Sequence, residues 1–378
     1  MCKIYNQKHA QIKDESMKRT ETITATYNRE LLTYFQLVPE QSLFLDIETT
    51  GLSPTTSMLY LIGVLYYNAD SNVFECIQWF NETGTVGEEK ELLNDFFTFV
   101  ANYRTLIHYN GDGFDIPYLT ACAKQHRIPN TLSYLDSFDI YKKIRPLKKL
   151  LNLPQLKQKS IEQFLQIDRK DTKDGGELIA VYKEYTQKKE EHLLELLLLH
   201  NADDIKGMLF ILPILHYIAL FDGAFSATEL FIRKNDVLIH LHITHSLPKP
   251  LTIEGNGILF TAAEHTATLQ VPVYQGELKY FYSNYKDYYY LPLEDTAIHK
   301  SVAAYVDKQY RTQAKASNCY SRKTGLFLPQ PEVIITPYYK SDYKNRATYF
   351  EITEEESISK EQLHEYVKSL LQYLYHLA

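Results

Sequence analysis

Acidic side chains in three separate segments are suited to holding a divalent cation. Asp46 and Glu48 lie two residues apart, Asp115 follows a glycine-containing turn, and His200 lies four residues before Asp204. Carboxylates that lie side by side repel one another unless something neutralises them, and a cation with oxygen ligands does so well. Metal coordination is therefore the chemistry that these residue types favour, provided that the fold brings the segments together.

The first segment is predicted to be a strand that presents both carboxylates on one face. Residues 42–48 are rich in apolar and β-branched types, and side chains alternate between the two faces of a strand. Asp46 and Glu48 would then share one face, while Leu45 and Ile47 occupy the other. The alternative is an amphipathic edge strand with a solvated acidic face.

The other two segments are predicted to lie at a helix start and on a helix. Asp115 comes at the junction of a strand, a glycine turn and a helix with Pro117 in its first turn, where an aspartate can also be a simple helix cap. His200 and Asp204 are four residues apart, so they share one helix face. An ordinary polar helix surface is the alternative for this pair.

Together, the three segments resemble the motifs of the DEDD superfamily of 3′→5′ exonucleases, which have a ribonuclease H-like fold. Asp46-x-Glu48 followed by Thr-Thr-Gly-Leu resembles the first motif, and a run from Asn110 through Asp115 to a proline resembles the second, Asn-Gly-x-x-Phe-Asp-x-Pro. An aspartate on a late helix after Tyr or His resembles the third. The intervening sequence is similar to the YprB-like branch of predicted exonucleases. The resemblance extends from about residue 41 to residue 218.

The resemblance implies a metal-dependent nuclease that hydrolyses phosphodiester bonds of DNA or RNA from the 3′ end. Two Mg²⁺ or Mn²⁺ ions would be held by four acids: Asp46, Glu48, Asp115 and Asp204. His200 would accept the proton of the attacking water. The three-residue gap between His200 and Asp204 is that of the tyrosine subclass, whereas the histidine subclass usually has one residue more. Asp203 is thus an alternative ligand if the helix register differs.

The predicted fold class is α/β. We expect an N-terminal arm over residues 1–36, a ribonuclease H-like mixed sheet flanked by helices over 37–221, and a smaller β-rich α+β domain of unknown role over 222–378. Length supports this division, because single hydrophobic cores stop growing near about 250–300 residues. A hydrophobic fraction of 45% and a charged fraction of 23% exclude a disordered or fibrous chain.

The remaining composition predicts a cytoplasmic protein without a membrane association. The cysteines form no Cys-x-x-Cys pair, the N-terminus lacks the apolar core of a signal peptide, and the apolar run near residues 209–221 is too short to span a bilayer. Formal net charge is −7, so a nucleic-acid surface must be a local patch.

Two basic patches are candidate nucleic-acid surfaces. Residues 141–189 carry an excess of Lys and Arg over Asp and Glu, and a helix predicted over residues 297–316 would place several basic groups on one face, opposite a buried stripe of Val302, Tyr305 and Val306. Solvated helix surfaces are the alternative in both cases. The candidate contacts are Asn110, Lys148, Lys149, Lys308, Arg311 and Lys315.

Two other functions remain open at this point. One is a ribonuclease H-like structure-specific endonuclease. The other is a non-catalytic nucleic-acid-binding adaptor, although clustered carboxylates facing phosphates would not help such a protein to bind. The choice between DNA and RNA, the strandedness of the substrate, protein partners and the oligomeric state are not specified by these patterns.

Overall fold

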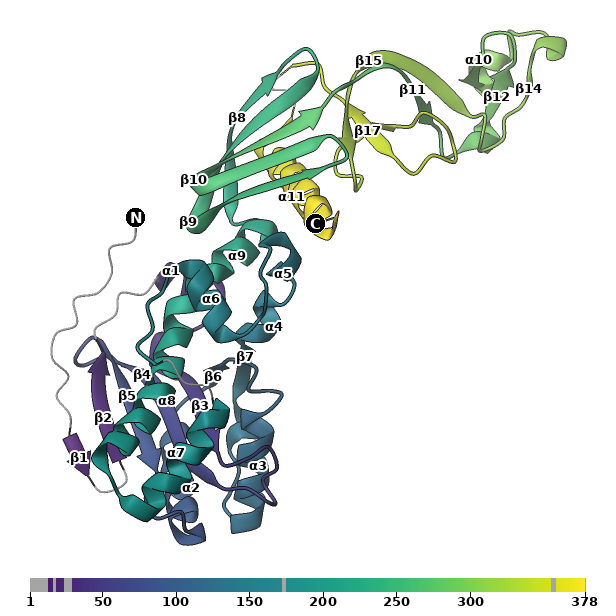
Figure 1. The fold of residues 1–378 in the computed structure, drawn as a ribbon. Coiled ribbons are helices and arrows are strands. Elements are labelled where there is room, and N and C mark those ends of the chain that lie inside the picture. The colour runs from purple at the N-terminus through teal and green to yellow at the C-terminus, as the bar shows by residue number, and fades with distance from the viewer. Residues whose placement is uncertain (1–12, 16–17, 24–28, 172–174, 355–357, 378) are drawn as a thin grey trace. The chain divides into compact units, whose positions relative to one another are not determined.

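The computed structural model describes residues 13–15, 18–23, 29–171, 175–354 and 358–377. The chain divides into two compact units, Met1–His216 and Tyr217–Ala378. The boundary expected after residue 221 lies a few residues beyond this division. Each unit has its own sheets and helices (Figure 1).

The first unit is built on a mixed sheet, which has seven strands within the described residues, in the order β1-β2-β5-β4-β3-β6-β7. The strands are β1 (Lys13–Glu15), β2 (Lys18–Ile23), β3 (Ser42–Thr49), β4 (Leu59–Asn68), β5 (Val73–Phe80), β6 (Thr105–His108) and β7 (Asp136–Asp139). Neighbouring strands in the part β1-β2-β5-β4-β3 of this order are antiparallel, whereas β6 is parallel to both β3 and β7.

Helices cover both faces of this sheet, which confirms the predicted α/β class. The helices of this unit are α1 (Arg29–Tyr34), α2 (Val86–Val100), α3 (Asp115–His126), α4 (Ile140–Ile144), α5 (Leu147–Leu150), α6 (Gln158–Leu165), α7 (Gly175–Lys188) and α8 (Glu191–Ile211). On one face, Leu45 and Ile47 of β3 join a core with residues of α2 and α3. On the other face, Tyr60 and Phe80 pack with residues of α7 and α8. Alternation along β3 therefore turns Asp46 and Glu48 towards α8.

The N-terminal segment is more ordered than the predicted arm in its described part. β2 pairs with β5 over six residues, from Lys18 opposite Trp79 to Ile23 opposite Phe74, and so extends the sheet. Lys206 of α8 also forms an ion pair with Glu21 of β2, with 2.8 Å between Nζ and Oε2. The polar alternation of this strand lacks the apolar run that marks the inner strands, which is why the sequence predicts an arm.

The second unit is β-rich, as predicted. One sheet contains β8 (Phe225–Ile232), β9 (Asp236–Gly255) and β10 (Ile258–Pro272), and a second contains β11 (Tyr274–Phe281), β15 (Tyr320–Gln330), β16 (Tyr338–Tyr339) and β17 (Thr348–Glu351). A third small sheet has β12 (Tyr288–Leu291), β13 (Thr296–His299) and β14 (Thr312–Gln313). The helices are α9 (His216–Asp222), which begins at the junction of the units, α10 (Lys300–Ala303) and α11 (Lys360–Leu377). The capping box predicted for α11 is present, because Ser359 and Gln362 exchange side-chain to backbone hydrogen bonds.

The helix predicted over residues 297–316 is wrong. The segment contains strand β13, the single turn α10, a short 3-10 turn at Lys308–Tyr310 and strand β14. Two of the three side chains expected to form a buried stripe are exposed instead, by 58% for Val302 and 92% for Tyr305, and Val306 is half-buried. Strand pairing of this segment with the tyrosine-rich β12 outweighs the local helical periodicity.

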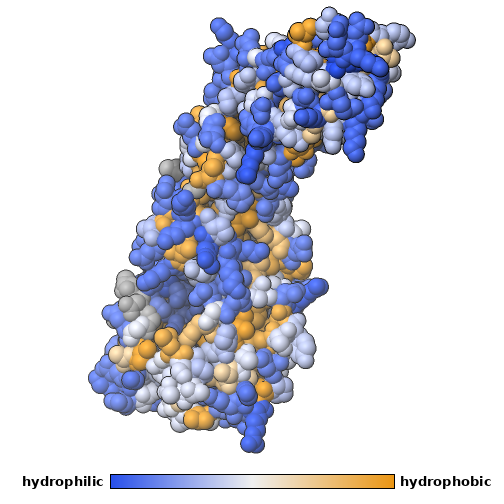
Figure 2. Space-filling model, turned by 90° about the vertical axis from the view of Figure 1, so that its right-hand side faces the viewer, coloured by the Kyte–Doolittle hydropathy of each residue, from blue (hydrophilic) through white to orange (hydrophobic). Residues whose placement is uncertain are grey.

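One helical stretch of the described residues, Glu191–Asp222, is long and apolar enough to cross a membrane, with a mean hydropathy of 1.6. Its most apolar window is 72% buried inside the structure, as in the core helix of a globular domain. Length and composition alone are weak support for a span when the helix is covered in this way. Figure 2 shows a face that is largely hydrophilic, with apolar residues in patches.

Candidate active site

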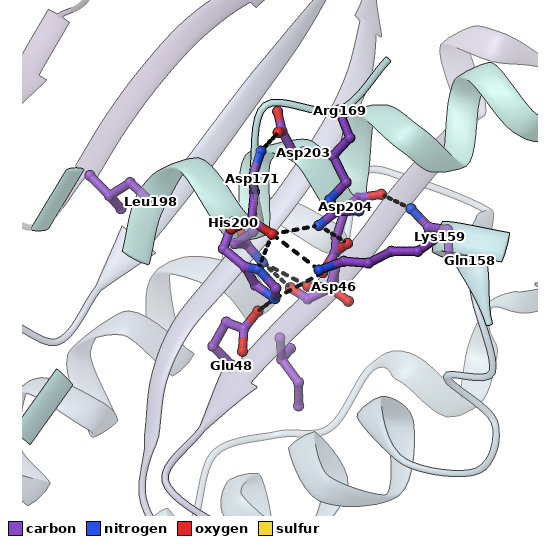
Figure 3. Close-up of polar contacts among 12 residues, drawn as sticks. Asp46, Glu48, Gln158, Lys159, Arg169, Asp171, Leu198, His200, Asp203 and Asp204 are labelled. Atoms are coloured by element: carbon purple, nitrogen blue, oxygen red, sulfur yellow. Dashed lines mark hydrogen bonds and ion pairs between the residues drawn. The ribbon is translucent and has the colours of Figure 1, made fainter. Parts of the chain in front are cut away.

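The fold brings the predicted acidic residues together. Asp46 and Glu48 come from the end of β3, Asp115 from the first residue of α3, and Asp204 from the middle of α8. The side-chain amide of Asn201 on α8 reaches Asp46. The imidazole of His200, on the same helix, reaches Glu48 (Figure 3). Strand, helix start and helix face thus converge because β3 lies between β4 and β6 and is covered by α8.

Hydrogen bonds and ion pairs fix the spacing of the acids. Asp115 Oδ1 accepts the backbone N–H of Ile47 at 3.2 Å, which holds this carboxylate beside the strand that carries Asp46 and Glu48. His200 Nε2 lies 3.5 Å from Glu48 Oε1 and 3.2 Å from Asp204 Oδ2. One ligand atom each from Glu48, His200 and Asp204 lie within 4.8 Å of one another, so they could share a cation.

Asn201 orients the Asp46 carboxylate and was missed by the sequence analysis. Its amide nitrogen donates to Asp46 Oδ2 at 2.8 Å, and its own oxygen accepts a hydrogen bond from Gln78 of β5 at 2.9 Å. Asn201 is fully buried. Gly63, opposite Asp46 in the β3–β4 register, leaves the space that Asn201 fills. No periodic pattern in the sequence marks Asn201 as a partner of Asp46, because the two residues are far apart in the chain and meet only in the fold.

The site disfavours negative charge when no cation is bound. Burial raises the pKa of Asp46 well above its usual range, and the nearby Asp204, Glu48 and Asp115 carboxylates raise it further, against the opposing hydrogen bond from Asn201. Burial and the Asp204 charge likewise raise the pKa of Glu48. Burial raises the pKa of Asp115 to about 7, although two backbone N–H groups oppose this. Such mutual repulsion is what a bound divalent cation would relieve.

The donor set suits a hard cation. Carboxylate oxygens from three elements match the ligands of Mg²⁺ and Mn²⁺, whereas a zinc site usually includes thiolates or several histidines. The four acids therefore fit the metal ions that the resemblance implies.

Asp204 rather than Asp203 faces the acids. Asp203 Oδ2 accepts the backbone N–H groups of Lys170 and Asp171, at 3.1 and 2.9 Å, and so ties the segment before α7 to α8. Asp203 also lines a cavity of about 650 Å³ that none of the four acids lines. Since Asp204 lies one turn after His200 on the same helix face, it is the carboxylate in position to bind a metal.

Charged side chains that the sequence analysis missed lie around His200 and Asp204 (Figure 3). Arg169 lies 2.5 Å from Asp204 Oδ1, and Asp171 Oδ2 lies 2.7 Å from His200 Nδ1. Lys159 and Arg169 each reach the Asp171 carboxylate at 3.3 Å. Burial would lower the pKa of Arg169, but the Asp204 and Glu162 charges raise it above its usual range. Arg169 and Asp171 lie outside regular helices and strands, where periodicity gives no signal.

The candidate nucleic-acid contacts fall into two groups. Asn110 lies in the turn before α3, and Lys148 and Lys149 are exposed on α5, all within the first unit. Lys308, Arg311 and Lys315 belong to the second unit, where they share no helix face. The Arg311 side chain is partly buried, donates to the carbonyl of Ala303 and lies over the Tyr289 ring at 4.9 Å. The prediction that these three residues share one basic helix face is therefore wrong.

A second cluster of possible ligands, His108, Asp112 and Asp139, lies near the start of α4. Asp139 caps α4 by accepting the backbone N–H of Lys142, whose side chain pairs with Asp112 at 2.6 Å. His108 Nδ1 accepts the backbone N–H of Gly111. These contacts give the cluster a role in holding the turn that leads to Asp115.

The raised pKa of Asp115 predicts a pH-dependent stability difference in the absence of metal. An ordinary aspartate pKa is about 3.9, so the folded state binds this proton more tightly than the unfolded state. Ionised Asp115 therefore lowers the free energy of unfolding. This loss of stability is absent below about pH 4, grows as pH rises and is complete above about pH 7. In EDTA, Asp115→Asn should therefore match the wild-type unfolding free energy near pH 4 and exceed it at pH 8, on the order of a few kcal/mol.

Urea unfolding of both proteins in EDTA at several pH values measures this difference. Saturating Mg²⁺ or Mn²⁺ should reduce the advantage of Asp115→Asn at pH 8, because the cation stabilises only the wild-type carboxylate cluster. A difference that does not change between pH 4 and pH 8 would contradict the raised pKa.

The chain is similar to a protein-family model and to several solved structures. Residues 43–215 match a family model described as the RNase_H superfamily. Among solved structures, the family B DNA polymerase of Pyrobaculum calidifontis shares 14% identity over 66% of this chain and 35% of its own, with a TM-score of 0.37. A zinc-bound E. coli ExoI–ssDNA complex shares 14% identity over 52% of this chain and 54% of its own, with a TM-score of 0.28.

The chain thus spans about a third of that polymerase and about half of that ExoI chain. No curated protein matches the sequence. Residues 43–215, which contain all four acids and His200, carry the RNase H-like fold that the three motifs predict, and a β-rich second unit follows them.

Proposed function

We propose that this protein is a metal-dependent nuclease that removes nucleotides from the 3′ end of DNA or RNA. One observation carries the proposal: Asp46, Glu48, Asp115 and Asp204 converge from β3, α3 and α8 into one largely buried site in which their charges repel. Such a site is costly without a cation. It is well suited to bringing divalent ions to an anionic phosphodiester.

The four acids would hold two Mg²⁺ or Mn²⁺ ions, which supply charge neutralisation and a more acidic bound water. His200 Nε2 points at Glu48 and Asp204, so it is placed to accept the proton of the attacking water. The water oxygen bonds to phosphorus, its proton passes to His200, the bond from phosphorus to the 3′-oxygen breaks, and solvent protonates that oxygen.

Membership of the YprB-like branch, the 3′→5′ direction and a cytoplasmic location are parts of the same proposal. They rest on the motifs around Asp46, Asp115 and His200 and on the composition of the chain. Lys148 and Lys149, both exposed in the first unit, are proposed to attract the phosphate backbone.

The direct test uses purified protein with 5′-labelled single-stranded DNA and RNA in Mg²⁺, Mn²⁺ or EDTA, resolved on a sequencing gel. We expect a ladder that shortens from the 3′ end and depends on metal. The preferred sugar is read from the same gel.

Circular single-stranded DNA is the matched control, because an exonuclease cannot start on it. Internal cuts, or cleavage of the circle, would replace the proposal with a structure-specific endonuclease. Absence of hydrolysis on every substrate with binding retained would replace it with a non-catalytic adaptor.

A further inference from the structure

Asp171 lies directly behind His200, on the side away from the acids. Its Oδ2 is 2.7 Å from His200 Nδ1, and both side chains are almost fully buried, with 5% and 6% exposed. Asp171 is far from His200 in the sequence and belongs to the segment between α6 and α7. The Asp203 side chain on α8 holds that segment in place by accepting hydrogen bonds from the backbone N–H groups of Lys170 and Asp171.

Cations surround the Asp171 carboxylate. Lys159 of α6 and Arg169 both lie 3.3 Å from the same oxygen that contacts His200. Positive charge at this distance favours the ionised carboxylate. An ionised carboxylate can only accept hydrogen bonds, so the hydrogen between Asp171 and His200 must belong to Nδ1 of the imidazole.

This hydrogen bond decides what the other ring nitrogen can do. With the hydrogen on Nδ1, the neutral imidazole has its lone pair on Nε2, the atom that faces Glu48 and Asp204. His200 and Asp204 are already in contact through their four-residue spacing on α8, which leaves Nδ1 as the ring position open to an orienting partner.

We propose that Asp171 is the positioning residue for His200. It holds the imidazole in the orientation and tautomer that can accept a proton at Nε2, and it stabilises the imidazolium that forms. The proposal rests on the proposed nuclease function, in which His200 accepts the proton of water. It adds a residue that none of the three motifs contains.

Kinetics of Asp171→Asn test this role against Asp168→Asn, which also removes one carboxylate charge, from an exposed aspartate of the same segment between α6 and α7. We expect kcat of Asp171→Asn to fall about 10- to 100-fold, while KM and the Mn²⁺ concentration for half-maximal activity stay within about twofold of wild type. Asp168→Asn should keep kcat within about twofold of wild type. Equal kcat losses in both variants, or an unchanged kcat in Asp171→Asn, would overturn the proposal.

Long-range ¹⁵N NMR spectra of the histidine rings test it without any turnover. With Mg²⁺ at pH 8 and the His200 signals assigned by His200→Gln, we expect the Nδ1–H tautomer in wild type and its loss in Asp171→Asn. An Nε2–H tautomer in wild type would overturn the positioning role, whatever the folding of the variant. If no substrate is hydrolysed by wild type, the proposed function fails while the spectrum still decides the role of Asp171.

Discussion

Asp46→Ala is expected to lose hydrolysis while the protein keeps its fold. Asp46 lies beside the other acids, because the charges of Asp204, Glu48 and Asp115 all raise its pKa, and Asn201 orients its carboxylate. Loss of a residue behind a metal ligand typically costs about 10–100-fold, so loss of a ligand in this position should exceed that range. The measurement is the initial rate on 5′-labelled substrate at saturating Mn²⁺.

Thermal unfolding in EDTA separates this effect from misfolding. Asp46→Ala should melt no lower than wild type, because the substitution removes one of several repelling buried charges. Asp136→Ala is the matched control, since Asp136 is an exposed aspartate of the same sheet and pairs with the exposed Arg104. Wild-type activity in a folded Asp46→Ala protein would refute the assignment of the active site.

Gly63→Ala is expected to damage both stability and activity. A methyl group at this position of β4 would overlap the Asn201 side-chain oxygen and the end of Ile205, both fully buried on α8. Overpacking of a closely packed core costs about 1–3 kcal/mol. Because Asn201 holds Asp46, its displacement should also lower kcat. Urea unfolding and the single-strand assay measure the two effects.

Gly87→Ala is the control for this substitution. Gly87 lies in α2, and the nearest atom to an added methyl group is 3.9 Å away. Alanine is the better helix former by about 1 kcal/mol, so this variant should be as stable as wild type or more stable. Unchanged melting and activity in Gly63→Ala would show that α8 can move away from β4 at no cost.

The acidic site is the part of the molecule that the sequence predicts well. Alternation along β3 and the four-residue spacing on α8 are local rules, and they place Asp46, Glu48, His200 and Asp204 as the fold does. Asp171 and Arg169 could not be found in this way. They reach the site from a segment without periodicity, and their positions depend on how α6 and α7 pack against α8.

The second unit shows the opposite outcome. Its strands are predicted by alternation, but residues 297–316 have a helical pattern of Lys, Arg and apolar residues that the structure does not use. Pairing between Tyr288–Leu291 and its neighbours β13 and β14 is a non-local contact, and it outweighs helix propensity over a short segment. The helical spacing of Lys308, Arg311 and Lys315 therefore does not correspond to a helix face in the structure.

Strand β2 covers a sheet edge through which copies of the protein could otherwise associate. The family match begins at residue 43, so β2 lies outside it, yet β2 covers the edge of β5 along six residues and is tied to α8 by the Glu21–Lys206 ion pair. An uncovered strand edge is a template for pairing with another chain. A polypeptide shortened to the matched residues would keep every acid of the site but leave the edge of β5 without β2, and we expect it to self-associate more than the full chain does.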